Sequence, residues 1–319
     1  MLDAWQPAGG SSGKPSKRGQ FSFMRIVRSI PELRVALKAV RESGQSIGLV
    51  PTMGFLHEGH ASLIRQSTAR CDTTVVTVFV NPTQFCPGED LERYPRDLER
   101  DQNLCLKLGV GTLFIPEPSE IYPTGFATSI EVGPMGDALC GRFRPGHFRG
   151  VATIVTKLFN LVQPDLAFFG QKDLQQTSIL RRVVKDLNLP VDILVAPTVR
   201  EPDGLALSSR NAYLSPQDRQ TALGISRGLL KAESLFQGGE RDADTLAAAV
   251  RQELQGMDEI QYCEAVDPLT LDTLAGPISR PAALCVAVVL GGTRLIDNVL
   301  LSPGGEGTQF ISHMESKDS

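Results

Sequence analysis

The spacing of apolar positions predicts which segments of the chain are buried strands and which are core helices. Residues 73–80 read Thr-Thr-Val-Val-Thr-Val-Phe-Val, and this β-branched run predicts a strand buried on both faces of a parallel sheet. Apolar residues at 151, 154, 155, 158, 159 and 162 predict a core helix that Pro164 stops. Similar reasoning predicts further strands at 48–52, 112–115, 128–132, 165–169 and 191–195, and further helices at 29–43, 58–70, 91–108 (interrupted near Tyr94-Pro95) and around 179–187.

Strands and helices alternate along the first two thirds of the chain. Repeated strand–helix units of this kind predict an α/β fold built on a doubly wound parallel sheet with right-handed crossovers. The pattern changes near Pro197. Two helices follow (215–236 and 243–254), and then antiparallel strands at 259–266 and 283–290, with 294–299 continuing the sheet. The sequence therefore predicts a second, smaller α+β domain.

These patterns define the expected domain boundaries. Residues 1–23 are rich in Gly, Ser, Lys and Pro without periodicity, which predicts a disordered extension. Residues 24–198 form the predicted sheet domain and residues 199–301 the smaller domain. Periodicity is lost again from Ser302, so residues 302–319 are expected to be a disordered tail.

Composition narrows the class of protein. The formal net charge of -4 argues against a dedicated nucleic-acid binder. No apolar run approaches the ~18 residues that a membrane span needs, and the N-terminal extension lacks the apolar core of a signal peptide. The six cysteines are scattered with no Cys-x-x-Cys pair, which is typical of reduced thiols in an intracellular protein.

The first candidate site is the segment Pro51-Thr-Met-Gly-Phe-Leu-His57-Glu-Gly-His60, between a strand and a helix. Two imidazoles three residues apart in the first helical turn can face the same side, where free N–H groups and the helix dipole favour an anion such as phosphate. Gly59 lets an anion approach the backbone. Two alternatives remain open: a zinc site using both histidines, and a pair of surface histidines that only cap the helix.

Other candidates follow later strands. Asn81 and Gln84 come after strand 73–80, where ligands of open α/β sheets gather, although an Asn-Pro turn without a ligand explains them equally well. Lys172 follows strand 165–169, at a second strand-to-helix corner where a flexible cation can reach a triphosphate. Ser208, Ser209 and Arg210 form a polar segment that can close over phosphate oxygens.

Two charged segments have open interpretations. Residues 141–150 hold three arginines and His147, which suits either an anionic substrate tail or local ion pairing on the surface. Asp97 and Asp101 lie four apart on the predicted helix, so they either help to hold a metal or form part of a solvated face.

Five motifs together resemble one known family, and the resemblance runs from Met24 to Leu301. They are Pro-Thr-Met-Gly-x-Leu-His-x-Gly-His, Phe-Val-Asn-Pro-Thr-Gln-Phe, Arg-Pro-Gly-His-Phe-Arg-Gly-Val, Gly-Gln-Lys-Asp-x-x-Gln and Val-Arg-Glu-Pro-Asp-Gly-Leu-Ala-x-Ser-Ser-Arg-Asn. The chain is thus similar to pantothenate synthetases (pantoate–β-alanine ligases) of the His-x-Gly-His nucleotidyltransferase-like superfamily. It departs at Gln171 and Leu207, where many members have Glu and Met.

The resemblance implies a Rossmann-like sheet domain with a C-terminal lid domain, in a cytoplasmic homodimer that binds no nucleic acid or membrane. It implies that pantoate and ATP form pantoyl adenylate and pyrophosphate, and that β-alanine then displaces AMP to give pantothenate. The implied catalytic residues are His60, His57, Lys172 and Arg210, and the implied pantoate and β-alanine site is Gln84, Gln176 and Asn81. The implied ATP site comprises Met53, Gly54, Phe55, Leu56, His57, Glu58, Gly59, His60, Gly170, Gln171, Lys172, Asp173, Val199, Leu207, Ser208, Ser209 and Arg210.

Mg²⁺ is the expected cofactor, held chiefly by phosphate oxygens and water, and the sequence names no protein ligand for it. Two other functions remain as alternatives. One is a nucleotidylyltransferase that leaves the nucleotide on another small acceptor, and the other is a nucleotide-binding protein without turnover.

Overall fold

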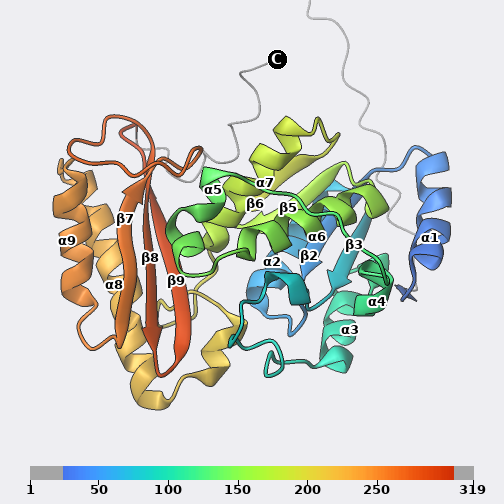
Figure 1. Ribbon diagram of the computed structural model, residues 1–319, viewed down its shortest axis with the longest axis horizontal. Helices are drawn as coiled ribbons and strands as arrows, with labels where there is room; N and C mark the ends of the chain where they lie inside the picture. Colours follow the sequence, from blue (N-terminus) through green and yellow to red (C-terminus); the bar gives the residue numbers. More distant parts are fainter. Residues whose placement is uncertain (1–23, 305–319) are drawn as a thin grey trace, which may run out of the picture.

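The computed structural model describes residues 24–304, and the two predicted disordered segments therefore lie outside the described residues, except for 302–304. The chain forms a larger unit around a parallel sheet and a smaller one around an antiparallel sheet, side by side (Figure 1). The predicted α/β class with a small C-terminal α+β region is confirmed.

The larger sheet has six strands, all parallel, in the order β1-β4-β3-β2-β5-β6. Strand order reverses between β2 and β5, which are neighbours, so the crevice beyond their carboxyl ends is where such folds place ligands. The strands are β1 Arg25–Val27, β2 Ile47–Thr52, β3 Thr73–Val78, β4 Thr112–Phe114, β5 Leu166–Gly170 and β6 Asp192–Ala196.

Helices cover both faces of this sheet, which explains why the central strands β2 and β3 are buried along almost their whole length. On β2 the adjacent residues Leu49 and Val50 point to opposite faces and enter two different cores. One core is formed with α1 (Ile30–Glu42), α6 (His147–Val162) and α7 (Leu174–Asp186), and the other with α2 (Glu58–Arg70) and α3 (Leu98–Lys107).

The smaller sheet is antiparallel, in the order β7 (Glu259–Val266), β8 (Ala282–Leu290) and β9 (Thr293–Leu301). Cys263 and Leu284 belong to the face that packs on α8 (Pro216–Gln237) and α9 (Ala243–Glu253). Tyr262 and Ala283 belong to the other face, which joins the core of the larger unit. The small sheet is therefore buried on both faces. One face packs on the helices of its own unit, and the other packs against the larger unit (Figure 1).

Several predicted elements differ from the structure. The helix expected at 91–108 begins only at Leu98, capped by Asp97, because Pro95 disfavours helix before it. The strand expected at 128–132 is wrong, since these residues form no strand. The loop expected at 141–150 contains the first turn of α6, while strand β1 was not predicted because it has only three residues and one buried side chain. Short helices α4 (Pro118–Ile121) and α5 (Pro134–Asp137) were also missed.

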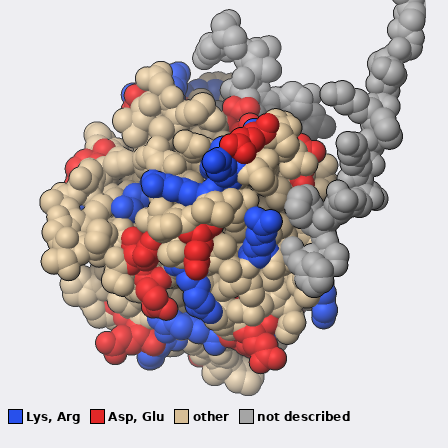
Figure 2. Space-filling model, turned by 90° about the vertical axis from the view of Figure 1, so that its right-hand side faces the viewer, with Lys and Arg blue, Asp and Glu red and all other residues tan. Residues whose placement is uncertain are grey.

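Two further properties concern the helices and the charged surface. Within residues 24–304, no helix is both long and apolar enough to cross a membrane. On the face shown in Figure 2, acidic and basic side chains are interspersed, so that face has no broad basic surface for nucleic acid.

Candidate active site

A cavity of about 770 Å³ lies between the carboxyl ends of the parallel strands and the C-terminal unit. His57, His60, Lys172 and Arg210, which come from three distant segments of the chain, all line it. Other predicted site residues that line the cavity are Met53, Gly59, Asn81, Gln84, Gly170, Asp173, Gln176, Val199, Leu207, Ser208 and Ser209.

Five residues of the predicted ATP site do not line this cavity. Leu56 is fully buried in the core beneath α2, and Glu58 is exposed and paired with Arg65. The Gln171 side chain lies against Asn298 of β9. Gly54 and Phe55 form the turn that precedes α2, both with positive φ. These positions support the site through the backbone, because their side chains do not reach the cavity.

The two histidines are oriented by hydrogen bonds within their own motif. His57 is the N-cap of α2, and its Nδ1 accepts a hydrogen bond from the Gly59 amide at 3.1 Å. His60 Nδ1 accepts one from the His57 amide at 3.3 Å. Because each Nδ1 is an acceptor, the proton of each neutral ring must reside on Nε2. A Cβ at Gly59 would come within 2.9 Å of the His57 ring, so a larger residue there would displace the ring from this position.

Both imidazoles are neutral at pH 7. Burial and, to a smaller extent, the positive charge of Lys172 lower the pKa of His57 to about 4. Burial also holds the pKa of His60 well below its usual value. The pair therefore provides two fixed Nε2–H donors without adding a charge, and the ring centroids are 4.1 Å apart.

Lys172 has a fixed backbone and an adaptable side chain. The Asn298 side-chain amide of β9 donates to the carbonyls of Gln171 and Lys172 at 2.9 and 3.0 Å. The ammonium is only 3.9 Å from Asp173 Oδ1, which is a loose ion pair. The corner after β5 is thus held by the C-terminal sheet, while the cation keeps freedom to reach an anion in the cavity.

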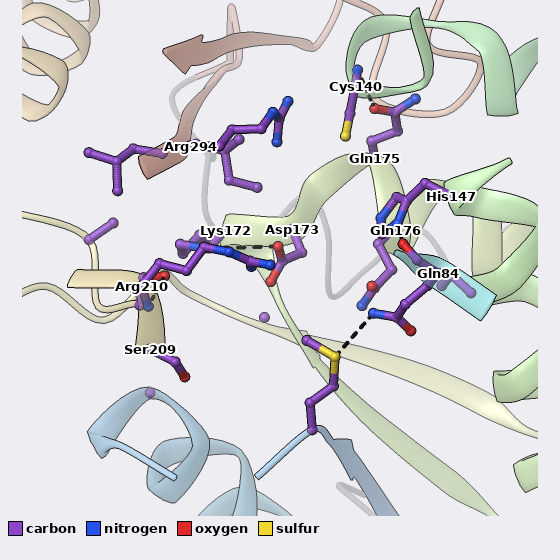
Figure 3. Close-up of a pocket in the computed structure, with 18 of the residues that line it drawn as sticks. Gln84, Cys140, His147, Lys172, Asp173, Gln175, Gln176, Ser209, Arg210 and Arg294 are labelled. Carbon is purple, nitrogen blue, oxygen red and sulfur yellow. Dashed lines mark hydrogen bonds and ion pairs between the residues drawn. The ribbon is translucent and has the colours of Figure 1, made fainter. Parts of the chain in front are cut away.

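Two glutamine amides point toward the same part of the cavity (Figure 3). Gln84 Nε2 contacts Met53 Sδ at 3.2 Å, and its Oε1 accepts from Asn81 Nδ2 at 3.1 Å. Asn81 is 1% exposed, and its Oδ1 accepts from the Tyr122 hydroxyl at 2.8 Å. Asn81 therefore serves mainly to orient Gln84, since its own polar atoms are already engaged.

The segment after β6 carries the predicted phosphate-binding group. Ser208 caps the short turn Ser209–Tyr213, and Ser209 Oγ donates to the Phe55 carbonyl at 3.4 Å. Arg210 donates to both carboxylate oxygens of Asp90, at 3.0 and 2.8 Å, and stacks over Tyr94. The sequence did not indicate this ion pair.

The arginines of residues 141–150 are all in ion pairs. Arg144 is partly buried at the cavity wall, donates to both carboxylate oxygens of Glu89 and contacts His147 at 3.0 Å. Arg142 and Arg149 are more exposed and pair with Glu264 and Glu131. All three arginines thus make local ion pairs, and the Arg144 pair lies partly buried in the cavity wall, so binding of an anionic substrate by this segment stays a prediction.

Asp101 has a role that sequence reasoning missed. It is 1% exposed, so the interpretation as part of a solvated face is wrong. Its carboxylate accepts the amides of Phe55 and Leu56 at 2.8 and 2.7 Å. These bonds stabilise the turn at Phe55, whose φ is +50°, and thereby fix where α2 begins. Burial raises the pKa of Asp101, and the two amides oppose that shift.

The residues described here contain no cluster of three or more His, Cys, Asp or Glu side chains suited to hold a metal ion. Asp90 and Glu89 at the cavity are already paired with arginines.

Comparison with known proteins gives a consistent result. Residues 25–300 match the family model described as Pantoate-beta-alanine ligase. The chain is 57% identical to pantothenate synthetase 1 of Bradyrhizobium diazoefficiens over 279 residues, covering 88% of this chain and 99% of that protein. It is 51% identical to pantothenate synthetase of Thermotoga neapolitana, covering 87% and 100%.

Solved structures agree. Pantothenate synthetase from Thermus thermophilus superposes with a TM-score of 0.83 at 46% identity, covering 88% of this chain and 100% of that one. The pantoate-beta-alanine ligase from Francisella tularensis, complexed with Beta-gamma ATP and Beta-alanine, gives a TM-score of 0.71 at 34% identity, covering 87% and 98%.

Proposed function

This chain belongs to the pantoate-beta-alanine ligase family, and from that premise we propose how its cavity performs the two steps of an ATP-dependent ligation. The enzyme joins pantoate and β-alanine to give pantothenate. In the first step the pantoate carboxylate attacks the α-phosphorus of ATP and pyrophosphate leaves. In the second the β-alanine amine attacks the acyl carbon of pantoyl adenylate and AMP leaves.

The observation that supports the proposal is that four side chains, from three distant segments of the chain, line one cavity. The Nε2–H groups of His57 and His60, the Lys172 ammonium and the Arg210 guanidinium surround the same space. Attack at phosphorus concentrates negative charge there, and preorganised donors and cations stabilise it. Because the histidines are neutral, they act as hydrogen-bond donors to phosphate oxygens, while Lys172 supplies the charge.

Pantoate fits beside this group of donors. Gln84 and Gln176 present amides that can bind hydroxyl groups, and Asn81 holds Gln84 in place. Apolar side chains of α6, including Val151 and Val155, line the same region and suit the aliphatic part of the acid. A buried site with such amides discriminates strongly against acids that lack the hydroxyls.

Arg210 has to exchange partners during the reaction. Its guanidinium is bound to Asp90, and a phosphate of ATP would compete for the same donors. Ser208 and Ser209 lie next to it on the segment that follows β6. We assign residues 24–198 to the binding of nucleotide and pantoate, and residues 199–301 to a lid domain that closes over the nucleotide.

Mg²⁺ is compatible with this arrangement only as a companion of ATP. Since the described residues offer no ready cluster of ligands, the ion would be held by phosphate oxygens and water, where it neutralises the departing pyrophosphate. A cytoplasmic location agrees with six cysteines that are all free. A homodimer is the state that the family resemblance implies, and sedimentation of the purified enzyme would measure it.

One assay tests the function directly. AMP should form only when ATP, pantoate and β-alanine are all present, and pantoate alone should support exchange of pyrophosphate into ATP. A stable adenylylated product would instead indicate a nucleotidylyltransferase. Absence of pyrophosphate release would indicate a binding protein without turnover.

A further inference from the structure

Arg294 is a cation in the cavity wall that lacks a counter-ion among the described residues. It lies on β9, and its side chain points into the cavity from the C-terminal sheet (Figure 3). Its Nε donates to Gln261 Oε1 at 2.8 Å. Its Nη2 is shielded from solvent and has no hydrogen-bond partner within residues 24–304. A buried charged donor without an acceptor is costly, so a side-chain rotation that brings Nη2 to an anion in the cavity is favourable.

The groups around Arg294 are neutral. The Tyr262 ring lies 5.9 Å from its guanidinium carbon, and burial raises the pKa of that phenol well above neutrality. Burial and the nearby Arg144 lower the pKa of His147 to about 3. Glu264 and Asp297 on the same sheet are paired with other arginines. No anion in this part of the described structure therefore compensates the charge of Arg294.

An irregularity in the sheet orients this cation. The pairing of β7 with β8 shifts register between Ile260 and Tyr262, so Gln261 is an extra residue in the strand. Such bulges redirect a side chain that regular alternation would point elsewhere. Here Gln261 contacts the Nε edge of Arg294, and the guanidinium carbon lies over the Tyr262 ring. Gln261 and Tyr262 thus hold the guanidinium without neutralising its charge, which leaves that charge for a ligand in the cavity.

The chemistry of the ligation leaves one anion to be placed. The triphosphate and the pantoate carboxylate must meet at the α-phosphorus, near the histidines and Lys172. The β-alanine carboxylate takes no part in bond formation, because the amine at the other end of that molecule reacts. It carries a full negative charge into the cavity and needs a separate cation.

We propose that Arg294 binds the carboxylate of β-alanine and so selects a short amino acid with a terminal carboxylate as the amine substrate. This inference rests on the proposed function. Guanidinium and carboxylate form paired, charge-assisted hydrogen bonds, and Arg294 lines the same cavity as His57, His60 and Lys172.

The test separates the two steps of the reaction. In Arg294→Gln, pantoate-dependent exchange of pyrophosphate into ATP, measured without β-alanine, should stay within about twofold of wild type. The KM for β-alanine should rise about 10- to 100-fold, the scale of losing a charged hydrogen bond. Arg280→Gln is the matched control, since Arg280 is exposed and pairs with Asp267 outside the cavity; it should leave both measurements unchanged.

A second substrate makes the result specific. With 3-aminopropanamide, which keeps the amine but lacks the carboxylate, wild type should be much less efficient than with β-alanine, and Arg294→Gln should reduce that preference at least tenfold. The proposal would be overturned if Arg294→Gln lost equal efficiency with β-alanine and with 3-aminopropanamide, or if its KM for ATP rose. Arg294→Lys should recover part of the preference. If wild type shows no exchange at all, the proposed function fails independently of this inference.

Discussion

The two walls of the cavity hold their functional groups in different ways. On the wall formed by the parallel sheet, His57 and His60 are oriented by backbone amides of their own motif. On the C-terminal wall, Arg210 and Arg294 are held by side chains that are far away in the sequence, Asp90 and Gln261. Local backbone bonds give fixed donors, whereas bonds between side chains can be exchanged for bonds to a substrate. We infer that the wall of the parallel sheet positions the reacting phosphorus, while the C-terminal wall adapts its side chains to the bound substrate.

The largest effect is expected at Lys172, the cation on the fixed wall. Lys172→Ala should lower the rate of AMP formation by roughly a hundredfold or more, because charge at the phosphorus loses its stabilising cation. Its free energy of unfolding should change little, since its ion pair is loose. Lys185→Ala, an exposed position on α7, is the control. Activity near that of wild type would refute the assigned role.

A matched pair of aspartates tests the contrast between fixed and exchangeable contacts. Asp101→Asn places an amide donor against the Phe55 and Leu56 amides, so we expect unfolding free energy to fall by about 2–3 kcal/mol and the rate of AMP formation to fall about tenfold. Asp90→Asn weakens an ion pair nearer the surface and should lower the unfolding free energy by less than about 1 kcal/mol. Denaturant titration measures both. If both substitutions lower the unfolding free energy by the same amount, the contrast between fixed and exchangeable contacts is refuted.

The smallest effect concerns pH. The pKa of His147 is about 3 in the folded protein and near 6.5 when unfolded, so the unfolded chain binds the proton first as pH falls. Stability is then full above about pH 6.5 and declines as pH drops toward 4. His147→Gln should remove part of this decline, on the order of 2 kcal/mol, in unfolding curves recorded at pH 7 and pH 4.5. If the unfolding free energy of His147→Gln falls between pH 7 and pH 4.5 as much as that of wild type, His147 is protonated in the folded state.

Much of the architecture was predictable because local patterns decide it. The β-branched run at Thr73–Val78 can be buried only as a central strand, and the apolar stripe of α6 fits only one helical face. The predicted strand at 128–132 failed because short, weakly alternating segments depend on neighbours that the pattern does not specify. Strand β1 was missed for the same reason, since it is stabilised by pairing with β4.

By itself, the sequence determined the order of strands and helices, the His-x-Gly-His helix start and the corner that carries Lys172, because each depends on residues within one turn of one another. Only the tertiary structure decided that Asp101 holds the turn before α2, that Asp90 binds Arg210, and that a bulge at Gln261 leaves Arg294 facing the cavity. Those contacts join residues 33 to 120 positions apart. Local periodicity carries no information about such partners, because many charged and amide side chains of the chain are chemically able to make the same bond.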